Sequence, residues 1–300
     1  MLPYIFSRLS RVSDFIFDMD YRKTIFSRLV LFLLHKINSD IKYVGLDVKG
    51  EKTFFFTGDN AITPYALATG GFQKEDVLKT ISLLQNIGLL KRGGIFLDIG
   101  ANIGTQTIYA LNSGFFKKAY CFEPVASNID LLQINLFANR FLDKAVVVSS
   151  ALSDFDGESE ITLSTSNCGD HRIVRTGQLD DRLTQKILCK TLDRYLSEQD
   201  LPADAISLVW MDTQGHEAQI LAGASNLLKS GTPFVIEFWP WALDQAGEYD
   251  RIIKIIKNNF SAFYDLQAKN LVKRKIEDLE EFVKKLDQNK DSFTDFLLTK

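Results

Sequence analysis

Residues 95–104 read Ile-Phe-Leu-Asp-Ile-Gly-Ala-Asn-Ile-Gly, and this stretch decides the fold of the 300-residue chain. The apolar run that ends in Leu97 is typical of a buried parallel strand, which Asp98 and Gly100 break at its carboxyl end. Gly104 then opens a helix that begins with Thr105. A strand, a glycine turn and a helix in this order place backbone N–H groups at the carboxyl edge of a sheet, where open α/β folds bind ligands. Because Gly100 has no Cβ, we expect a ligand to lie against its backbone.

The spacing of this turn indicates the kind of nucleotide cofactor. A dinucleotide-binding turn reads Gly-x-Gly-x-x-Gly, so that a pyrophosphate can lie on the helix N-terminus. Here the pattern is Asp98-x-Gly100-x-x-x-Gly104, with Asn102 inside the turn. A carboxylate at Asp98 would repel a diphosphate but would accept hydrogen bonds from an ammonium group. The turn therefore predicts a zwitterionic, phosphate-free ligand such as S-adenosylmethionine, and it argues against a nicotinamide-dependent oxidoreductase, an alternative function on a similar sheet.

A second apolar strand, 119–122, ends at Glu123-Pro124. Proline cannot continue the hydrogen-bond ladder, so Glu123 is left at the strand tip. An acid about 20 residues past a glycine turn is the usual means of holding both ribose hydroxyls. The alternative is that Glu123 only caps the helix that begins near Ser127.

The amino-acid composition is that of an ordinary globular protein with no expected nucleic-acid partner. The apolar fraction of 46% and the charged fraction of 24% are those of an ordinary globular protein, and a net charge of −3 gives no reason to expect nucleic acid as a partner. The three cysteines, Cys121, Cys168 and Cys189, form no pattern, which favours a reducing, cytoplasmic location. Cys168-x-x-His171 resembles half of a metal site, but the chain holds no second half, so we expect no bound metal.

The amino-terminal residues 1–43 are basic and apolar. They hold seven Lys or Arg against four Asp, and apolar residues recur at helical spacing from Phe26 to Leu34. The longest uncharged apolar stretch, 29–34, is far too short to span a membrane, and no signal peptide is evident. Such a segment can lie on an anionic membrane surface. The interpretation we favour is packing of these helices over one side of the domain or at a dimer interface.

The order of the predicted elements indicates a doubly wound α/β domain. We expect an extension over 1–90 with helices at 2–18, 22–38 and 74–90 and a β region at 43–56, and then a main domain over 91–300 with an inserted hairpin and loop at 155–190. Strands and helices that alternate predict a parallel sheet with helices on both faces. The predicted strands are 95–99, 119–122, 145–150, 206–211, 234–238, 260–266 and 293–299, with one antiparallel strand at the sheet edge; the helices between them are 104–112, 127–139, 190–198, 217–229 and 248–258.

Four motifs follow one another in this order: Asp98 to Gly104, then Phe122-Glu123-Pro124, then Ala151-Leu152-Ser153-Asp154 with Gly157, and finally Asp212-x-Gln214-Gly215-His216-Glu217. This series resembles the FkbM family of S-adenosylmethionine-dependent methyltransferases from about Gly94 to Glu237. The resemblance implies a Rossmann-like class I methyltransferase fold, in which a seven-stranded, mostly parallel sheet has helices on both faces and an antiparallel last strand.

The resemblance also implies roles for the residues of these motifs. The turn residues Asp98, Gly100, Asn102, Gly104 and Thr105 would hold the methionine part of S-adenosylmethionine, and Glu123 its ribose. The segment Ser150, Ala151 and Leu152 would lie near the adenine, and Asp212 would face the methyl group and the acceptor.

One departure from the family pattern concerns the general base. Family members commonly read Lys-Ile-Asp-Val-Glu-Gly-x-Glu where this chain has tryptophan at 210 and glutamine at 214. A hydroxyl acceptor needs a base, and we favour His216, which titrates near neutrality, with Asp212 assisting it. The alternatives are that Asp212 only binds the cofactor ammonium or caps a helix, and that His216 faces solvent.

Four further residues are candidates for contact with the acceptor. His171 lies on the insertion, Glu237 ends a strand at the same sheet edge, and Trp239 with Trp241 follows it as an apolar or sugar-stacking wall. The alternatives are an exposed loop histidine and packed aromatic rings. The favoured function is O-methylation of a small molecule, sugar or glycan; a further alternative is a non-catalytic, cofactor-binding module that acts through its amino-terminal helices.

Overall fold

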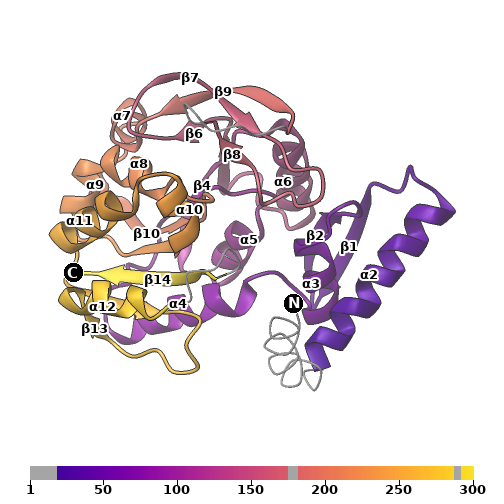
Figure 1. The fold of residues 1–300 in the computed structure, drawn as a ribbon, viewed down its shortest axis with the longest axis horizontal. Coiled ribbons are helices and arrows are strands. Elements are labelled where there is room, and N and C mark those ends of the chain that lie inside the picture. The colour runs from indigo at the N-terminus through magenta and orange to yellow at the C-terminus, as the bar shows by residue number, and fades with distance from the viewer. Residues whose placement is uncertain (1–18, 175–181, 287–291) are drawn as a thin grey trace, which may run out of the picture. The chain divides into compact units, whose positions relative to one another are not determined.

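The computed structural model describes residues 19–174, 182–286 and 292–300. The helix predicted over 2–18 lies outside the described residues. The chain divides into two compact units, one of residues 1–72 with 165–168 and one of residues 73–164 with 169–300. Each unit is described by itself below (Figure 1).

From residue 19 onward, the described part of the first unit holds two helices and a hairpin. The helix α2 packs against α3, and β1 pairs with β2 in antiparallel register. The turn at Lys49-Gly50 joins the two strands, and both residues have positive φ, at 56° and 88°. Asp59 fixes the start of α3 by accepting hydrogen bonds from the backbone N–H groups of Ala61 and Thr63. The elements are α2 (Met19–Ile37), β1 (Tyr43–Val48), β2 (Glu51–Phe56) and α3 (Ile62–Thr69).

The second unit contains a large, mostly parallel sheet of the Rossmann-like kind, as predicted (Figure 1). Its strand order is β13-β12-β14-β11-β10-β3-β4-β5, and the strands from β11 to β5 are all parallel. The strands are β3 (Gly94–Ile99), β4 (Phe116–Phe122), β5 (Ala145–Val148), β10 (Ile206–Met211), β11 (Phe234–Phe238), β12 (Ala262–Asp265), β13 (Arg274–Lys275) and β14 (Thr294–Thr299).

The position of the antiparallel strand differs from the prediction. β14 lies between β11 and β12 and is antiparallel to both, whereas the sequence predicts an antiparallel strand at the edge. The chain passes from β11 through the helix α11 (Tyr249–Asn259) to β12 and leaves a gap one strand wide beside β11. The last strand enters that gap from the opposite end and therefore runs antiparallel. The two-residue strand β13 pairs with β12 and gives the sheet an eighth strand.

Helices cover both faces of this sheet. Side chains alternate along each strand, so the apolar strands present apolar side chains on both faces. In β3, Ile95, Leu97 and Ile99 belong to one buried apolar cluster and Phe96 to another. The first cluster is covered by α7 (Leu192–Glu198), α8 (Glu217–Ala222), α9 (Ser225–Lys229), α11 (Tyr249–Asn259) and α12 (Leu279–Lys284), and the second by α4 (Lys74–Asn86), α5 (Thr105–Asn112) and α6 (Ala126–Ala138).

Several helical regions differ from the sequence prediction, which includes neither α3 nor α12. The helix predicted over 217–229 is interrupted at Gly223, where a Cβ would lie 2.1 Å from the backbone oxygen of Ser153. A short helix that we did not predict, α10 (Pro240–Gln245), begins with a proline, which is favourable in a first helical turn. The 3-10 turns are Ala203–Ala205 and Ile276–Asp278.

Three strands of the predicted insertion form a second, four-stranded sheet together with β6, which precedes the insertion, in the order β6-β9-β7-β8. Its hairpin is the antiparallel pair of β7 and β9, so the turn at Asp156-Gly157 leads into β7 and does not close the hairpin. β6 follows the tip of β5 directly and pairs with β9. The strands are β6 (Ala151–Leu152), β7 (Gly157–Thr162), β8 (Arg172–Ile173) and β9 (Thr184–Lys190).

Candidate functional site

The carboxyl ends of β3, β4 and β5 meet at one edge of the large sheet. Ile99 is paired with Phe122, and Phe122 with Val148, so the three strands end side by side. The N–H group of Gly100 donates to the Phe122 carbonyl, and the N–H group of Glu123 donates to the Val148 carbonyl. The glycine turn, the Glu123 tip and Ser150 are therefore brought to one edge, where open α/β sheets bind ligands.

Glu123 joins the glycine turn to the start of α6. Its Oε2 accepts a hydrogen bond of 2.9 Å from the Asn102 N–H, and its Oε1 accepts one of 2.8 Å from the Val125 N–H. The side chain is 5% exposed, and this burial raises its pKa to about 7 against the opposing effect of the hydrogen bonds. A carboxylate has about four acceptor positions. The Asn128 side chain is a third hydrogen-bond partner of Glu123, so this carboxylate stabilises the turn and keeps acceptor capacity for a ligand hydroxyl group.

Asp98 points toward α5. Its Oδ2 accepts a hydrogen bond of 2.6 Å from the Thr107 hydroxyl, which also lies 3.1 Å from Cys121 Sγ. Burial raises the pKa of Asp98 to about 7, and the neighbouring Asp212 contributes to the rise. The sequence had indicated the acid but not Thr107 as its partner, because only the packing of α5 on β3 brings the two together.

The glycines of the turn are required by protein contacts. Gly100 has a φ of 78°, and a Cβ on it would lie 2.0 Å from the backbone oxygen of Asp212. Gly104 has a φ of 85°, and its Cβ would lie 3.1 Å from Leu132 of α6. The sequence did not indicate this contact of Gly100 with the end of β10, and close approach of a ligand to the Gly100 backbone stays a prediction.

Two buried polar atoms at this edge lack a protein partner. In the part of the chain that the structure describes, neither Asn102 Oδ1 nor Ser150 Oγ has a hydrogen-bond partner. Buried polar atoms are nearly always hydrogen-bonded, so such atoms need an explanation. The other predicted adenine contacts, Ala151 and Leu152, are 7% and 2% exposed and belong to β6. Thr105, the first residue of α5, donates to Gln106 over 2.7 Å.

A group of acids lies beside the tip of β10. Gln214, at a φ of 54°, donates from one side-chain nitrogen to Asp212 Oδ1 and to Glu237 Oε2, over 3.0 Å in each case. Glu237 is also the cross-strand neighbour of Asp295 on β14. Burial raises the pKa of all three acids, that of Asp295 to about 8. Sequence reasoning missed Asp295, which no motif marks.

The structure gives His216 and Asp212 different partners. His216 is 6% exposed, and its Nε2 lies 3.0 Å from the hydroxyl of Ser153, which follows β6. Glu217, fully buried, accepts hydrogen bonds from the N–H groups of Thr213 and Gly215 over 3.0 and 3.2 Å. Glu217 therefore holds the backbone of the turn between β10 and α8. At the departure from the family pattern, Trp210 is 1% exposed within the apolar cluster under α4 to α6.

The four candidate acceptor residues differ in what they contact. His171 Nδ1 accepts a hydrogen bond of 3.0 Å from the Ser164 N–H within the insertion, while Glu237 belongs to the acid group above. Trp239 is 9% exposed, and the guanidinium of Arg172 lies 4.8 Å from its ring and 6.0 Å from that of Trp241. Arg172 is also paired with Asp170 at 2.6 Å. The insertion is thus stacked on the segment that follows β11.

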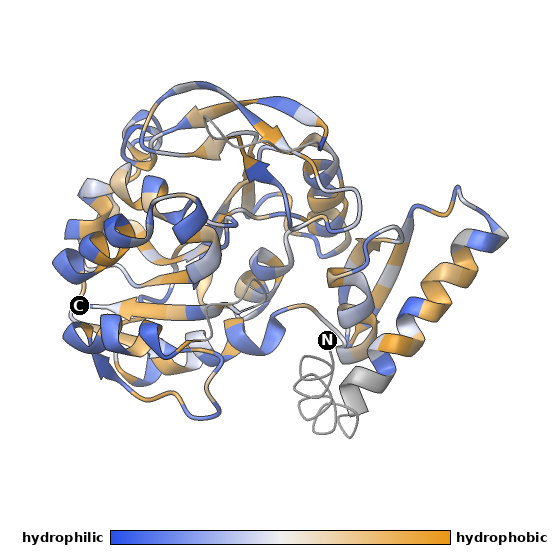
Figure 2. Cartoon of the chain, viewed as in Figure 1, coloured by the Kyte–Doolittle hydropathy of each residue, from blue (hydrophilic) through white to orange (hydrophobic). Residues whose placement is uncertain are grey.

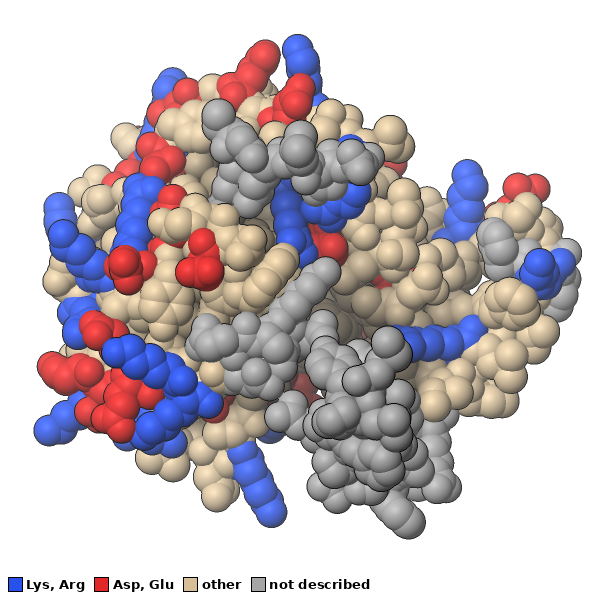
Figure 3. Space-filling model, viewed as in Figure 1, with Lys and Arg blue, Asp and Glu red and all other residues tan. Residues whose placement is uncertain are grey.

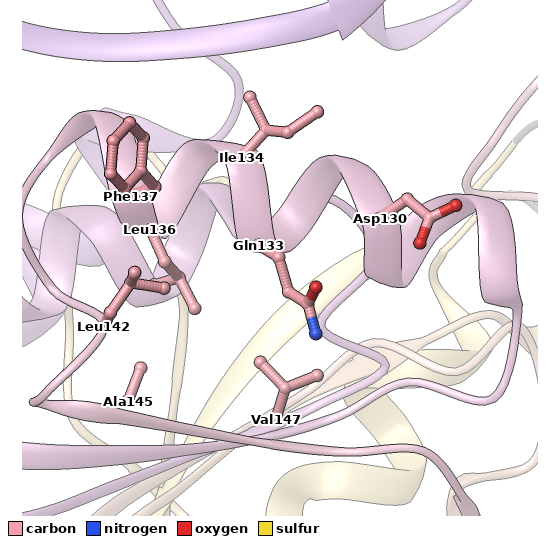
Figure 4. A pocket seen from close by; sticks show the side chains of 8 residues that line it. All are labelled: Asp130, Gln133, Ile134, Leu136, Phe137, Leu142, Ala145 and Val147. Atoms are coloured by element: carbon pink, nitrogen blue, oxygen red, sulfur yellow. The ribbon is translucent and has the colours of Figure 1, made fainter.

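An apolar hollow lies elsewhere on the second unit. It has a volume of about 660 Å³ and includes none of the predicted site residues (Figure 4). It lies between α6 and the β5 edge strand, and its lining residues are Asp130, Gln133, Ile134, Leu136, Phe137, Leu142, Ala145 and Val147. Within the described ranges, no group of three or more His, Cys, Asp or Glu side chains is arranged to hold a metal ion.

Comparison with known proteins points to one family. A family model described as the methyltransferase FkbM domain matches residues 98–262, which include every predicted cofactor, catalytic and acceptor residue. No curated protein matches the chain.

Solved structures resemble the chain in fold alone. One is a methyltransferase FkbM from Methylobacillus flagellatus KT, with 13% identity and a TM-score of 0.41 over 80% of this chain and 66% of that one, just under two thirds of its length. A precorrin-6y C5,15-methyltransferase from Geobacter metallireducens has 13% identity and a TM-score of 0.40, over 75% of this chain and 88% of that one. A putative methyltransferase from Streptococcus mutans in complex with SAH has 12% identity and a TM-score of 0.40, over 73% of this chain and 97% of that one.

Proposed function

This chain belongs to the FkbM methyltransferase domain family, and from that membership we infer that it transfers a methyl group from S-adenosylmethionine to a hydroxyl group of a small molecule, sugar or glycan. The observation that best supports the cofactor is the pair of buried polar atoms, Asn102 Oδ1 and Ser150 Oγ, at the tips of the two strands that flank Glu123. A ligand with hydroxyl, amino and ammonium donors would satisfy both atoms.

The residues present fit this cofactor. Glu123 would accept hydrogen bonds from the ribose hydroxyls, Asn102 from a donor of the methionine part, and Ser150 would bind near the adenine. The acids at this edge, Asp98 among them, favour a ligand with two positive charges, because a nearby cation stabilises the charged carboxylate. When bound, S-adenosylmethionine supplies an electrophilic methyl group on a sulfonium sulfur.

We assign the removal of the acceptor proton to Asp212, with Glu237 as its partner. Asp212 is half-buried at the tip of β10, and the Gln214 amide connects it to Glu237. Burial raises the pKa of both acids, and a base is most effective when its pKa approaches the working pH. His216, favoured from the sequence, is 6% exposed and lies against Ser153, so in this proposal it orients the turn.

The cofactor is tested by calorimetric titration with S-adenosylhomocysteine and, separately, with NAD. We expect micromolar binding of S-adenosylhomocysteine to the wild type and a loss of about tenfold, or 1.4 kcal/mol, in Glu123→Ala. Glu277→Ala, at an exposed position, is the control and should bind as the wild type does. Preference for NAD would favour the oxidoreductase alternative, and binding of neither ligand would overturn the proposal.

Catalysis is tested separately, with a tritiated methyl donor and a panel of hydroxylated sugars and small molecules. A double variant, Asp212→Ala with His216→Ala, that keeps its affinity for S-adenosylhomocysteine should lose methyl transfer. The single variants Asp212→Asn and His216→Gln then assign the base, because only loss of the true base should remove the dependence of kcat on pH. Transfer that persists in the double variant would exclude both residues.

A further inference from the structure

One face of α2 presents large apolar side chains to solvent. Five of them are between 49% and 66% exposed and recur at helical spacing along one side of the helix (Figure 2). They are Ile25, Phe26, Leu29, Phe32 and Leu33. The opposite side, with Ser27 at 7% and Leu31 at 4% exposed, is packed within the first unit, where α2 contacts α3. The helix α2 therefore has apolar side chains both on the side that packs within the first unit and on the side that faces solvent.

The charged residues that follow Asp20 in α2 have one sign. Between residues 21 and 38 the sequence contains four basic residues and no Asp or Glu. Three of them, Lys23, Arg28 and Lys36, have exposed side chains in the structure, and basic side chains are visible beside the tan surface of α2 in Figure 3. Lys36 also lies 5.5 Å from the ring of Phe32, so a positive charge borders the apolar face directly.

An exposed apolar face flanked by basic residues is typical of a helix that binds a membrane surface. A single exposed apolar residue needs no explanation, but a continuous apolar face does. A helix with an apolar face and basic flanks lies in the plane of an anionic bilayer, with its rings among the acyl chains and its cations at the headgroups. Insertion across the bilayer is a different matter: among the described residues, no helix is long and apolar enough to cross a membrane.

We propose that the exposed face of α2 docks this protein onto an anionic phospholipid surface. The sequence left this open beside packing and dimerisation, and what favours the lipid surface is that the face is exposed and that every Asp, Glu, Lys or Arg position between residues 21 and 38 is Lys or Arg. A second copy of the chain would bring the same positive charges together, since in a symmetric dimer each face meets its own kind. An anionic surface instead meets them with opposite charge. The proposal is independent of the methyl-transfer reaction.

The test is sedimentation of the full-length protein with two kinds of vesicle, one of phosphatidylcholine alone and one with about 30 mol% phosphatidylserine. We expect at least about tenfold tighter binding to the anionic vesicles at low salt, and less binding as the salt concentration rises. Phe26→Ser with Phe32→Ser should weaken binding by about tenfold or more, because two exposed aromatic rings no longer enter the bilayer. Arg28→Glu with Lys36→Glu should abolish the preference for anionic lipid.

A matched control comes from the second unit. Phe137 and Leu142, 71% and 55% exposed at the hollow beside α6, are equally apolar and lie in a different unit, so Phe137→Ser with Leu142→Ser should bind within twofold of the wild type. Circular dichroism confirms that each variant is folded. The proposal is overturned if the wild type does not prefer anionic vesicles, or if the α2 variants bind as the wild type does. It is equally overturned if light scattering shows a dimer that Phe26→Ser with Phe32→Ser dissociates while vesicle binding persists, since the face would then be an interface between copies.

Discussion

The side-chain nitrogen of Gln214 donates a hydrogen bond of 3.0 Å to Oε2 of Glu237, and the same nitrogen lies 3.0 Å from Oδ1 of Asp212. Position 214 is where the family pattern commonly has glutamate. An amide at this position can donate to both carboxylates at once, which an ionised glutamate cannot. Glutamine here is therefore matched to the two acids beside it, and the departure from the pattern has a structural reason.

Substitution Gln214→Glu should destabilise the protein by about 1–3 kcal/mol at pH 8, because it removes the donor and adds a third buried acid. The deficit should grow as pH rises. Burial beside acids raises the folded pKa of the new carboxyl, so the folded state holds a proton that the unfolded state has released, and unfolding is favoured at higher pH. Denaturant unfolding at pH 5 and pH 8 measures this. Gln214→Ala is the control, which loses the donor without adding charge, and a Glu variant as stable as wild type at pH 8 would contradict the explanation.

Asp295 should make the wild type less stable as pH rises from about 4 to about 8. Burial, together with the nearby Asp212, raises the pKa of Asp295 in the folded state from an ordinary 3.8 to about 8. The free energy of unfolding that comes from this retained proton is therefore fully present below pH 4 and is lost as the pH rises to 8. Asp295→Asn should remove this part of the decrease in the free energy of unfolding with pH, and should raise that free energy at pH 8 by about 1 kcal/mol or more. Thermal unfolding across this range is the measurement, with the exposed Asp143→Asn as control. An unchanged slope in Asp295→Asn would show that other acids cause it.

Affinity for S-adenosylmethionine should increase between pH 6 and pH 8. Asp98 and Glu123 have pKa values of about 7 in the free protein, and a bound cation lowers the pKa of a nearby carboxyl. Binding therefore releases protons and becomes tighter as pH rises. S-adenosylhomocysteine lacks the sulfonium charge, so its affinity should depend less on pH. Calorimetry of both ligands at three pH values tests this, and equal pH dependence for the two would count against attraction between these acids and the sulfonium.

Gly100→Ala should destabilise the protein far more than Gly114→Ala. Both glycines have a positive φ, 78° and 73°, so each substitution costs about 1–2 kcal/mol of backbone strain. At Gly114 a Cβ would meet nothing within 4 Å, whereas at Gly100 it would lie 2.0 Å from the Asp212 carbonyl oxygen. The difference between the two variants in free energy of unfolding isolates the contact of the turn with β10. A difference below about 1 kcal/mol would mean that β10 moves away without cost.

Arg172→Ala should change the tryptophan fluorescence of the protein and reduce its stability by about 1 kcal/mol. The guanidinium stacks on Trp239 and Trp241 and pairs with Asp170, so its loss uncovers both rings and frees β8 from them. Arg274→Ala is the control, because that guanidinium stacks on Phe282, at 4.8 Å, and should leave the emission spectrum unchanged. Identical spectra for Arg172→Ala and the wild type would show that the stacking does not persist in solution.

Local patterns in the sequence predicted most of the large sheet. Strand β3, the turn at Gly100 and helix α5 follow one another in the chain, and apolar periodicity with turn residues specifies such units directly. The tip at Glu123 followed from the proline beside it. The location of β14 between β11 and β12 could not be predicted from such patterns, because strand order depends on which edges remain free after the other strands have paired.

The α/β class, the strand tips and the family could all be predicted, since they depend on residues close together in the chain. Which side chains meet is a result of the folded arrangement: Gln214 meets Glu237, Glu237 meets Asp295, His216 meets Ser153, and Gly100 meets the Asp212 carbonyl. The physical reason is that each of these contacts joins different strands or loops. Burial and side-chain pairing at a sheet edge are set by the neighbouring strands, and no spacing along one strand specifies them.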